Sequence, residues 1–158
     1  MTEPITSVVV RDVMNPRVIS VQSTDTLRSC IERMASNQVH AVPVVGMFGE
    51  CRGILTSSDL FRITRVIEQD LVEMQRMDPA TGRWMLSQLS DELVNQQVGD
   101  AMTPDVTSVH EDSSILSAAQ TMLRQQVHRL PVVDHQDRVV GIVSTTDLLA
   151  AFVERSTE

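Results

Sequence analysis

One stretch of the chain recurs 88 residues further on, without a gap. Val10–Pro16 corresponds to Val98–Pro104, and the same offset still pairs Asp59 with Asp147. Between these ends it also aligns Val18 and Val21 with Val106 and Val109, Met34 with Met122, Gln38–His40 with Gln126–His128, Pro43–Val45 with Pro131–Val133, and Gly53–Ile54 with Gly141–Ile142. A register held over roughly fifty residues indicates a duplicated unit. The chain is therefore expected to fold as two copies of one unit.

Each copy shows the same order of expected elements: strand, helix, strand, strand, helix. The first strand is expected at 18–21 and 106–109. The first helix is expected to be opened by a capping residue within Ser23–Asp25 in copy one and within Asp112–Ser114 in copy two. The next two strands are expected at 41–45 with 53–56 and at 129–133 with 139–144, and the second helix from Ser57 and Thr145. The apolar face of the first helix is expected to comprise Leu27, Ile31 and Met34 in copy one, and Ile115, Ala119, Met122 and Leu123 in copy two.

This order predicts an α+β fold of two βαββα repeats. One unit of about fifty residues is marginally stable alone, because it leaves a sheet face bare. Two copies bury these faces against each other around a pseudo-two-fold axis, and we expect two equivalent clefts to result. The predicted domains are residues 8–64, a helical insert at 65–97, and residues 98–152.

The insert between the copies has helical spacing of its apolar residues on both sides of a break. Leu60, Ile63, Ile67, Leu71 and Met74 continue the second helix of copy one, and Trp84, Leu86, Leu89, Leu93 and Val94 suggest a further helix. Asp78-Pro79 is expected to break the first helix and Thr81-Gly82 to turn the chain. Two interpretations stay open: a helical hairpin packed on the domain, or an element for dimerisation or partner docking.

Composition excludes several function classes. The net charge of −8 argues against a nucleic-acid binder, whose surface is basic. No run is apolar enough to span a membrane, and the first residues lack the features of a signal peptide, so we expect a cytoplasmic protein. Cys30 and Cys51 have no metal-ligand spacing, and Cys30 reads as a small core residue. Catalytic motifs are missing, so we expect no enzyme, no catalytic residue and no metal site.

The strongest local motif is a run of three Ser or Thr residues followed by Asp. It gives Thr56, Ser57 and Asp59 in copy one, and Ser144, Thr145 and Asp147 in copy two. A hydroxyl followed three residues later by an acid can simply cap a helix. The same hydroxyls at a helix N-terminus can also meet phosphate oxygens, and the carboxylate can accept hydrogen bonds from two ribose hydroxyls. Both interpretations stay open, and the duplication favours binding.

A second motif precedes the middle strand of each copy. It places His40 beside Ala41 in copy one and His128 beside Arg129 in copy two. The histidines could cap the end of the preceding helix, or they could belong to a binding site in which Arg129 contacts phosphate. Because copy one has Ala41 where copy two has Arg129, we expect the two clefts to differ in their affinity for anions.

Taken together these motifs resemble a tandem pair of CBS domains, named after cystathionine β-synthase and also called a Bateman module. The resemblance rests on V-x-D-x-M-x-P, V-x-S-V, H-x-h-P-V-V (h is an apolar residue) and G-I-h-[ST]-[ST]-[ST]-D-L, and covers Val8–Thr64 and Val98–Phe152. It implies a regulatory module that binds AMP, ADP, ATP or an S-adenosyl ligand, requires no cofactor for chemistry, and often forms a homodimer. With no other domain attached, it would act in trans on a regulated protein that the sequence does not name.

The resemblance also assigns roles to individual residues. Asp59 and Asp147 would hold ribose hydroxyls, and the segment at His128-Arg129 would contact phosphate. Phosphate or ribose would meet Thr56, Ser57, Ser144 and Thr145, the base would lie against Val18, Ile19, Val106 and Thr107, and the backbone around Ala41 and Arg129 would be near. The alternative is a structural dimerisation or interaction module with empty clefts, in which both aspartates are only caps.

Overall fold

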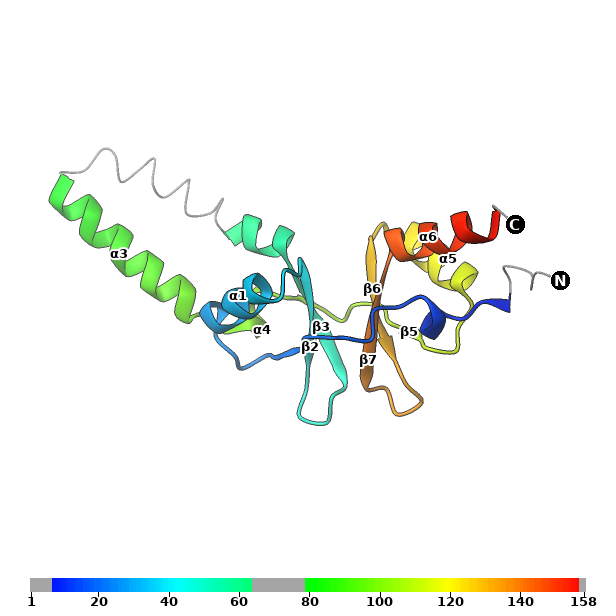
Figure 1. The fold of residues 1–158 in the computed structure, drawn as a ribbon. Helices are drawn as coiled ribbons and strands as arrows, with labels where there is room; N and C mark the ends of the chain where they lie inside the picture. Colours follow the sequence, from blue (N-terminus) through cyan, green and yellow to red (C-terminus); the bar gives the residue numbers. More distant parts are fainter. Residues whose placement is uncertain (1–6, 64–78, 157–158) are drawn as a thin grey trace. The chain divides into compact units, whose positions relative to one another are not determined.

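The computed structural model describes residues 7–63 and 79–156 (Figure 1). The chain divides into two compact units. We call Ile19–Val44 with Gly53–Pro104 the Asp59 unit, and Met1–Val18 with Val45–Arg52 and Asp105–Glu158 the Asp147 unit. Both units mix small sheets with helices, so the predicted α+β class is confirmed.

The Asp59 unit has its strands in the order β1-β2-β3-β4. Residues 57–63 begin a helix directly after β3, and β4 pairs antiparallel with β3. The elements are β1 (Val21–Gln22), α1 (Leu27–Ser36), β2 (Ala41–Val45), β3 (Cys51–Thr56), α3 (Pro79–Asn95), α4 (Val98–Ala101) and β4 (Thr103–Pro104).

The Asp147 unit has a sheet of order β5-β6-β7, in which β6 is parallel to β5 and antiparallel to β7. Helices α5 and α6 lie next to each other and contact this sheet (Figure 1). The elements are a 3-10 helix (Val10–Asp12), β5 (Val109–His110), α5 (Ile115–Gln125), β6 (Arg129–Val133), β7 (Val139–Ser144) and α6 (Thr145–Ser156).

The two units exchange their opening segments. The segment that opens copy one joins the Asp147 unit, where Asn15 and Ile142 exchange two backbone hydrogen bonds of 2.9 and 3.1 Å. The segment that opens copy two joins the Asp59 unit in the same way, with Thr103 opposite Ile54. Val10 and Val98 are fully buried there, and burial of a valine side chain contributes about 1.5–3 kcal/mol. The sheet and core of each copy are therefore completed by the segment that opens the other copy.

The glycine of each repeat is explained by this crossing segment. A Cβ atom at Gly141 would collide with Met14 Sδ, and one at Gly53 would come within 2.5 Å of the Thr103 carbonyl oxygen. Only a residue without a side chain lets the crossing segment lie this close to the strand.

The two cores are built from the same positions of the repeat. The Asp59 unit buries Val21, Leu27, Cys30, Met34, Val42, Val44, Leu55 and Val98, and the Asp147 unit buries the equivalent Val109, Ile115, Ala118, Met122, Leu130, Val132, Val143 and Val10. The interpretation of Cys30 as a core residue is confirmed, and burial raises the pKa of its thiol to about 11. The predicted helix faces are partly wrong, because Ile31 is 40% and Leu123 80% exposed.

Three boundary predictions are also wrong. The first strands are β1 and β5, which start only at Val21 and Val109, because the residues before them have no strand partner. The first helix of copy one is capped by Thr26, whose hydroxyl accepts from the Ser29 amide, rather than by residues 23–25. In copy two the cap is Ser114, within the predicted set.

The insert is helical where the structure describes it. A further helix is confirmed as α3, which contacts α1. Thr81 and Gly82 lie inside α3 and do not turn the chain; Pro79 begins the helix, a position where proline's missing N–H costs nothing. The predicted stripe at Ile67, Leu71 and Met74 falls outside the described residues. None of the helices in the described part has the length and hydropathy needed to cross a membrane.

Candidate functional site

Both copies place the Ser/Thr-Asp motif at the junction between a strand and the following helix. In the Asp59 unit, Asp59 Oδ2 accepts from the Thr56 amide at 2.8 Å and from the Thr56 hydroxyl at 2.9 Å. The Thr56 hydroxyl in turn accepts from the Asp59 amide at 3.3 Å. This reciprocal pair satisfies donors at the helix start. The capping interpretation is therefore confirmed, and it uses one carboxylate oxygen.

The Asp147 unit repeats this cap atom for atom. Asp147 Oδ2 accepts from the Ser144 amide and from the Ser144 hydroxyl, both at 2.7 Å. The Ser144 hydroxyl accepts from the Asp147 amide at 3.2 Å. Here too one oxygen of the carboxylate is committed to the cap. Any difference in what the two aspartate side chains contact must therefore lie at the second oxygen.

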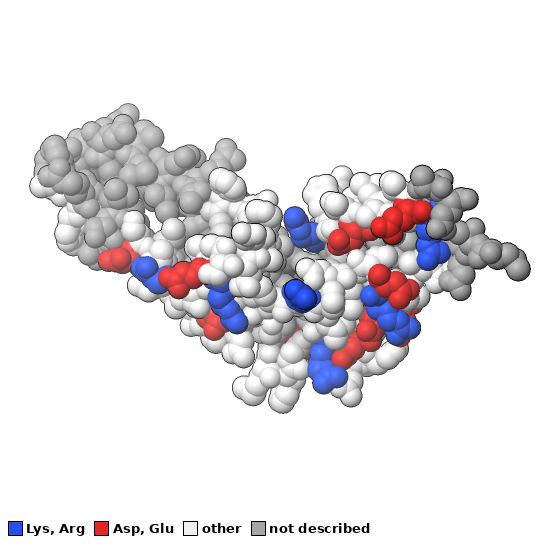
Figure 2. Space-filling view, viewed as in Figure 1, with Lys and Arg blue, Asp and Glu red and all other residues white. Residues whose placement is uncertain are grey.

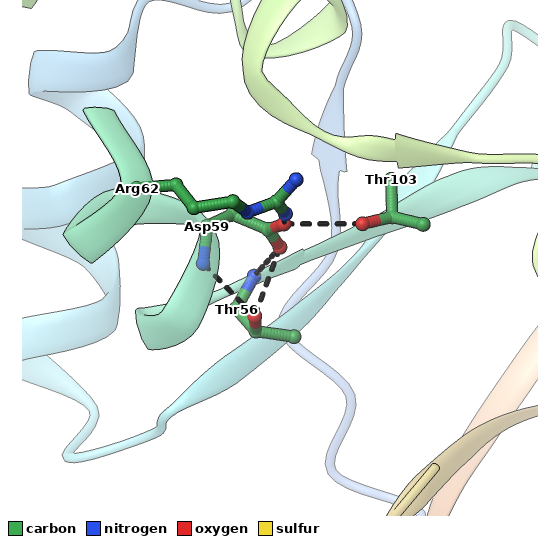
Figure 3. A network of polar contacts seen from close by, with 4 residues as sticks. All are labelled: Thr56, Asp59, Arg62 and Thr103. Atoms are coloured by element: carbon green, nitrogen blue, oxygen red, sulfur yellow. Dashed lines mark hydrogen bonds and ion pairs between the residues drawn. The ribbon is translucent and has the colours of Figure 1, made fainter. Parts of the chain in front are cut away.

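The second oxygen of Asp59 is held from two further directions (Figure 3). Arg62, one turn along the helix, forms an ion pair with Asp59 Oδ1, and the Thr103 hydroxyl donates to the same atom at 3.1 Å. The Asp59 side chain is 2% exposed. We call Thr56, Asp59, Arg62 and Thr103 the Asp59 cluster.

Sequence reasoning missed both Arg62 and Thr103. Arg62 follows Asp59 by three residues, a spacing that brings helical side chains together, so the ion pair could have been expected. Thr103 lies in the segment that opens copy two. The contact between Thr103 and Asp59 could have been predicted only if the segment exchange had been known.

The second oxygen of Asp147 has no hydrogen-bond or ion-pair partner among residues 7–63 and 79–156. The position equivalent to Arg62 is Ala150, and the position equivalent to Thr103 is Asn15. The Asn15 side-chain oxygen accepts from the Arg17 amide at 3.0 Å. We call Ser144 and Asp147 the Asp147 cluster. Asp147 is only partly buried.

The next hydroxyl of each motif fastens the helix start to the preceding strand. Ser57 donates through its amide at 2.9 Å and its hydroxyl at 3.3 Å to the His40 carbonyl. Thr145 does the same to the His128 carbonyl, at 2.9 and 3.3 Å. The two histidines thus meet the helix start through their backbones. Neither imidazole hydrogen-bonds to a helix end within the described residues, so the capping interpretation of these side chains finds no support.

Arg129 lies beside the helix start of the Asp147 unit. It opens β6 and is paired in register with Ser144, the last residue of β7. Its side chain is exposed, and the described residues offer it no ion-pair partner. The equivalent Ala41 opens β2 and is 9% exposed. A cation is therefore available at one helix start and absent from the same position of the other.

The residues expected to border a base lie in the irregular segments before β1 and β5. Val18, Ile19 and Val106 are half-buried and Thr107 is exposed, and Ile19 packs on the core of the Asp59 unit. Their contact with a ligand, like the cleft between the copies, stays a prediction.

The charged residues of the described part form neither a basic surface patch on the face shown in Figure 2 nor a metal-binding cluster. On the face shown in Figure 2, arginines alternate with acidic residues over the described part, without an extended basic patch. Among the described residues, no three His, Cys, Asp or Glu side chains are arranged to hold a metal ion.

Comparison with known proteins gives one family. Its description is "CBS domain", and it matches twice, at residues 10–65 and 98–154. An uncharacterized protein of Methanocaldococcus jannaschii is 26% identical over 153 residues, which cover 91% of this chain and 90% of that protein. Of the next two curated relatives the chain covers only 58% and 22% of the length.

Two solved structures show the same fold. CBSX2 of Arabidopsis thaliana, in complex with AMP, aligns with a TM-score of 0.70 and 23% identity over 94% of this chain and 98% of that chain. The CBS domain pair of protein MJ0100, in complex with 5-methylthioadenosine and S-adenosyl-L-methionine, aligns with a TM-score of 0.66 and 23% identity, again over 94% and 98%.

Proposed function

The chain belongs to the CBS domain family, as a tandem pair, and we propose that it is a regulatory module that binds an adenosine-containing ligand. The observation that carries this proposal is the second oxygen of Asp147. It is a carboxylate acceptor at a helix start, held in place by the cap and left without a partner among the described residues. A pair of vicinal ribose hydroxyls supplies two donors that suit such an acceptor.

The phosphate of a nucleotide would extend from the ribose toward cationic and amide donors. Arg129 is paired in register with Ser144, so its guanidinium can reach an anion beside the start of α6. Guanidinium groups form strong, charge-assisted hydrogen bonds with phosphate. We infer that the Asp147 unit prefers a nucleotide over its nucleoside. His128 and Thr145 serve this site through the backbone contact that fastens the helix start.

The adenosine class of ligand is supported by what related proteins hold. CBSX2 is described in complex with AMP, and the MJ0100 domain pair with 5-methylthioadenosine and S-adenosyl-L-methionine. For this chain we propose AMP, ADP or ATP as ligand, with an S-adenosyl compound as the alternative. The ligand acts as a regulatory signal, and the module acts in trans, without catalysis, on a partner protein.

Isothermal titration calorimetry of the folded chain with AMP, ADP, ATP, adenosine and S-adenosyl-L-methionine tests the proposal. We expect saturable binding of at least one of these compounds, and a rise in melting temperature with its concentration, because a ligand of the native state stabilises it by mass action. GMP is the matched control, since it has the same ribose and phosphate on another base. Absence of heat and of any thermal shift with every adenosine compound would contradict the proposal.

The second candidate function is a structural interaction module that acts as a homodimer. It is favoured by large apolar side chains on the adjacent helices α5 and α6 that remain exposed, namely Leu116, Leu123, Leu149 and Val153. A second copy is the natural occupant of such a face, because a two-fold pairing matches each apolar side chain with an identical surface. Sedimentation equilibrium, with Leu123→Glu as the disrupting variant and the helix-surface change Gln120→Glu as its control, distinguishes a dimer from a monomer. Dimerisation and ligand binding are compatible, so calorimetry decides between an occupied and an empty module.

A further inference from the structure

The carboxylate of Asp59 has every acceptor position in use. An ionised carboxylate offers about four lone-pair positions on its two oxygens. In the Asp59 cluster they receive the Thr56 amide, the Thr56 hydroxyl, the Arg62 guanidinium and the Thr103 hydroxyl (Figure 3). All four donors belong to the Asp59 unit itself. A ribose could bind this carboxylate only after displacing donors that are already there.

The carboxylate of Asp147 has about half of its acceptor positions in use. The Ser144 amide and hydroxyl occupy one oxygen, as in the other cluster. At the position of Arg62 stands Ala150, whose side chain has no donor, and at the position of Thr103 stands Asn15, whose side-chain amide nitrogen makes no hydrogen bond to Asp147. The two remaining positions match the two hydroxyls of a ribose in number.

Displacement at Asp59 is unfavourable for an electrostatic reason as well. The guanidinium of Arg62 neutralises a carboxylate that is 2% exposed. Ribose hydroxyls are neutral, so a ligand that replaced the arginine would leave the buried negative charge without its cation. The exposed end of Arg62 is 70% accessible, so it could move, but only by giving up this ion pair.

We propose that Arg62 closes the Asp59 carboxylate to ribose, so that the chain takes one adenosine ligand, at Asp147. This inference rests on the proposed function, because it decides which of two equivalent positions that function uses. Arg62 is a residue that determines binding specificity between the repeats. The equivalent Ala150 leaves the other repeat open.

A pair of reciprocal variants tests the role of Arg62. Arg62→Ala removes the closing cation, and Ala150→Arg introduces it at the equivalent position of α6, where the side chain is exposed. Adenosine is the probe, because it carries the ribose hydroxyls and needs no phosphate contact. The number of adenosine molecules per folded chain is counted by native mass spectrometry and by calorimetry. Arg33→Ala is the control, since it removes an arginine of the same unit whose partner, Asp25, lies 3.8 Å away.

The expected counts are one adenosine for the wild type, two for Arg62→Ala, and one for Arg33→Ala. Ala150→Arg should weaken binding on the order of tenfold to a hundredfold, because the new guanidinium competes for the Asp147 carboxylate. If Arg62→Ala fails to fold, the loss in Ala150→Arg alone supports the inference, and unchanged binding by that variant overturns it.

The outcomes separate this inference from the proposed function. Two adenosine molecules on the wild type, or one on a folded Arg62→Ala chain, would overturn the role of Arg62 and leave the ligand-binding module standing. No binding of adenosine or AMP by any of the chains would remove the proposed function, and the role of Arg62 with it.

Discussion

The Asp59 and Asp147 clusters start from the same cap and differ in what reaches the second carboxylate oxygen. Thr56 and Ser144 make the same three hydrogen bonds to the two aspartates. Beyond that cap, Asp59 gains an ion pair with Arg62 and a hydrogen bond from Thr103, whereas Asp147 gains neither. Asp59 is thus nearly inaccessible and ion-paired, whereas Asp147 is partly accessible and has no ion-pair partner among the described residues.

The difference shows that folding and binding make separate demands on the same motif. The cap needs only one oxygen of the aspartate, so both copies can start their helix equally well. The second oxygen is available for another purpose, and two positions outside the motif decide its use. Reading the motif alone therefore finds both aspartates and gives no reason to distinguish them.

The largest expected effect is on ligand affinity at Asp147. Asp147→Asn should weaken AMP binding about tenfold to a hundredfold, because hydrogen bonds to a charged group contribute about 1.5–3 kcal/mol. Asp59→Asn should leave AMP affinity within about twofold, and lower the melting temperature through loss of the Arg62 ion pair. Calorimetry on both variants measures the first effect and circular dichroism the second. The assignment of the ligand to Asp147 would be contradicted if Asp59→Asn, rather than Asp147→Asn, abolished AMP binding.

The next effect concerns phosphate. Arg129→Ala should weaken AMP binding about tenfold, because it removes a charge-assisted hydrogen bond, and should leave adenosine binding unchanged. Calorimetry with both ligands measures the ratio. Arg124→Ala, which removes the same charge from the exposed surface of α5, is the control for a general change in net charge. An equal loss of affinity for adenosine and for AMP would mean that Arg129 stabilises the fold and does not contact phosphate.

A smaller and symmetric effect is expected at the caps. Thr56→Ala and Ser144→Ala should each lower the free energy of unfolding by about 1 kcal/mol, since both remove a capping hydroxyl. Urea denaturation followed by circular dichroism gives the two values. Losses that differ by more than about 1 kcal/mol would show that the caps are not equivalent, and the comparison would then extend to the helix starts themselves.

The smallest effect is expected with acid, at the hairpin turns of the two copies. The backbone amide of Arg138 holds the pKa of Asp134 below its usual value, and the backbone amide of Glu50 does the same for the pKa of its own carboxyl. A folded pKa below the unfolded one means that stability is present above the unfolded value, about pH 4, and is lost as the pH falls through the folded value.

Acid denaturation of Glu50→Gln and Asp134→Asn measures these contributions. Both variants should show a weaker fall in melting temperature below about pH 4 than the wild type. Because both turns are exposed and use a carboxylate in the same way, the two changes should be similar in size. An effect in one turn only would mean that the copies differ outside the aspartate clusters as well.

Most of the fold follows from the repeat and its motifs. The offset that aligns Asp59 with Asp147 also aligns the strands, helices and buried positions, because each core is filled by residues at the same places in the repeat. The capping pattern located both helix starts to the residue. Strand boundaries were less predictable, since Val18 and Val106 have strand-forming side chains without a neighbouring strand to pair with.

The sequence does not indicate which of the two sheets and cores each opening segment joins. Val10 and Val98 look alike, and nothing local says which core either one enters. Thr103 reaches Asp59 only because of that exchange, and it shares the second oxygen of Asp59 with Arg62. The difference between the two clusters is thus partly local, through Arg62, and partly a long-range property of the fold, through Thr103.

The exchange of segments also sets an order of events during synthesis. Residues 19–104 contain everything that the Asp59 unit needs, so this half can close while the rest of the chain is still being made. Val8 and Asn15 are synthesised before residues 19–104, yet the backbone groups that bind them, at Ile115 and Ile142, are synthesised after these residues. The segment that contains Val8 and Asn15 therefore has to wait for copy two, and the unit that carries the accessible aspartate closes after the Asp59 unit.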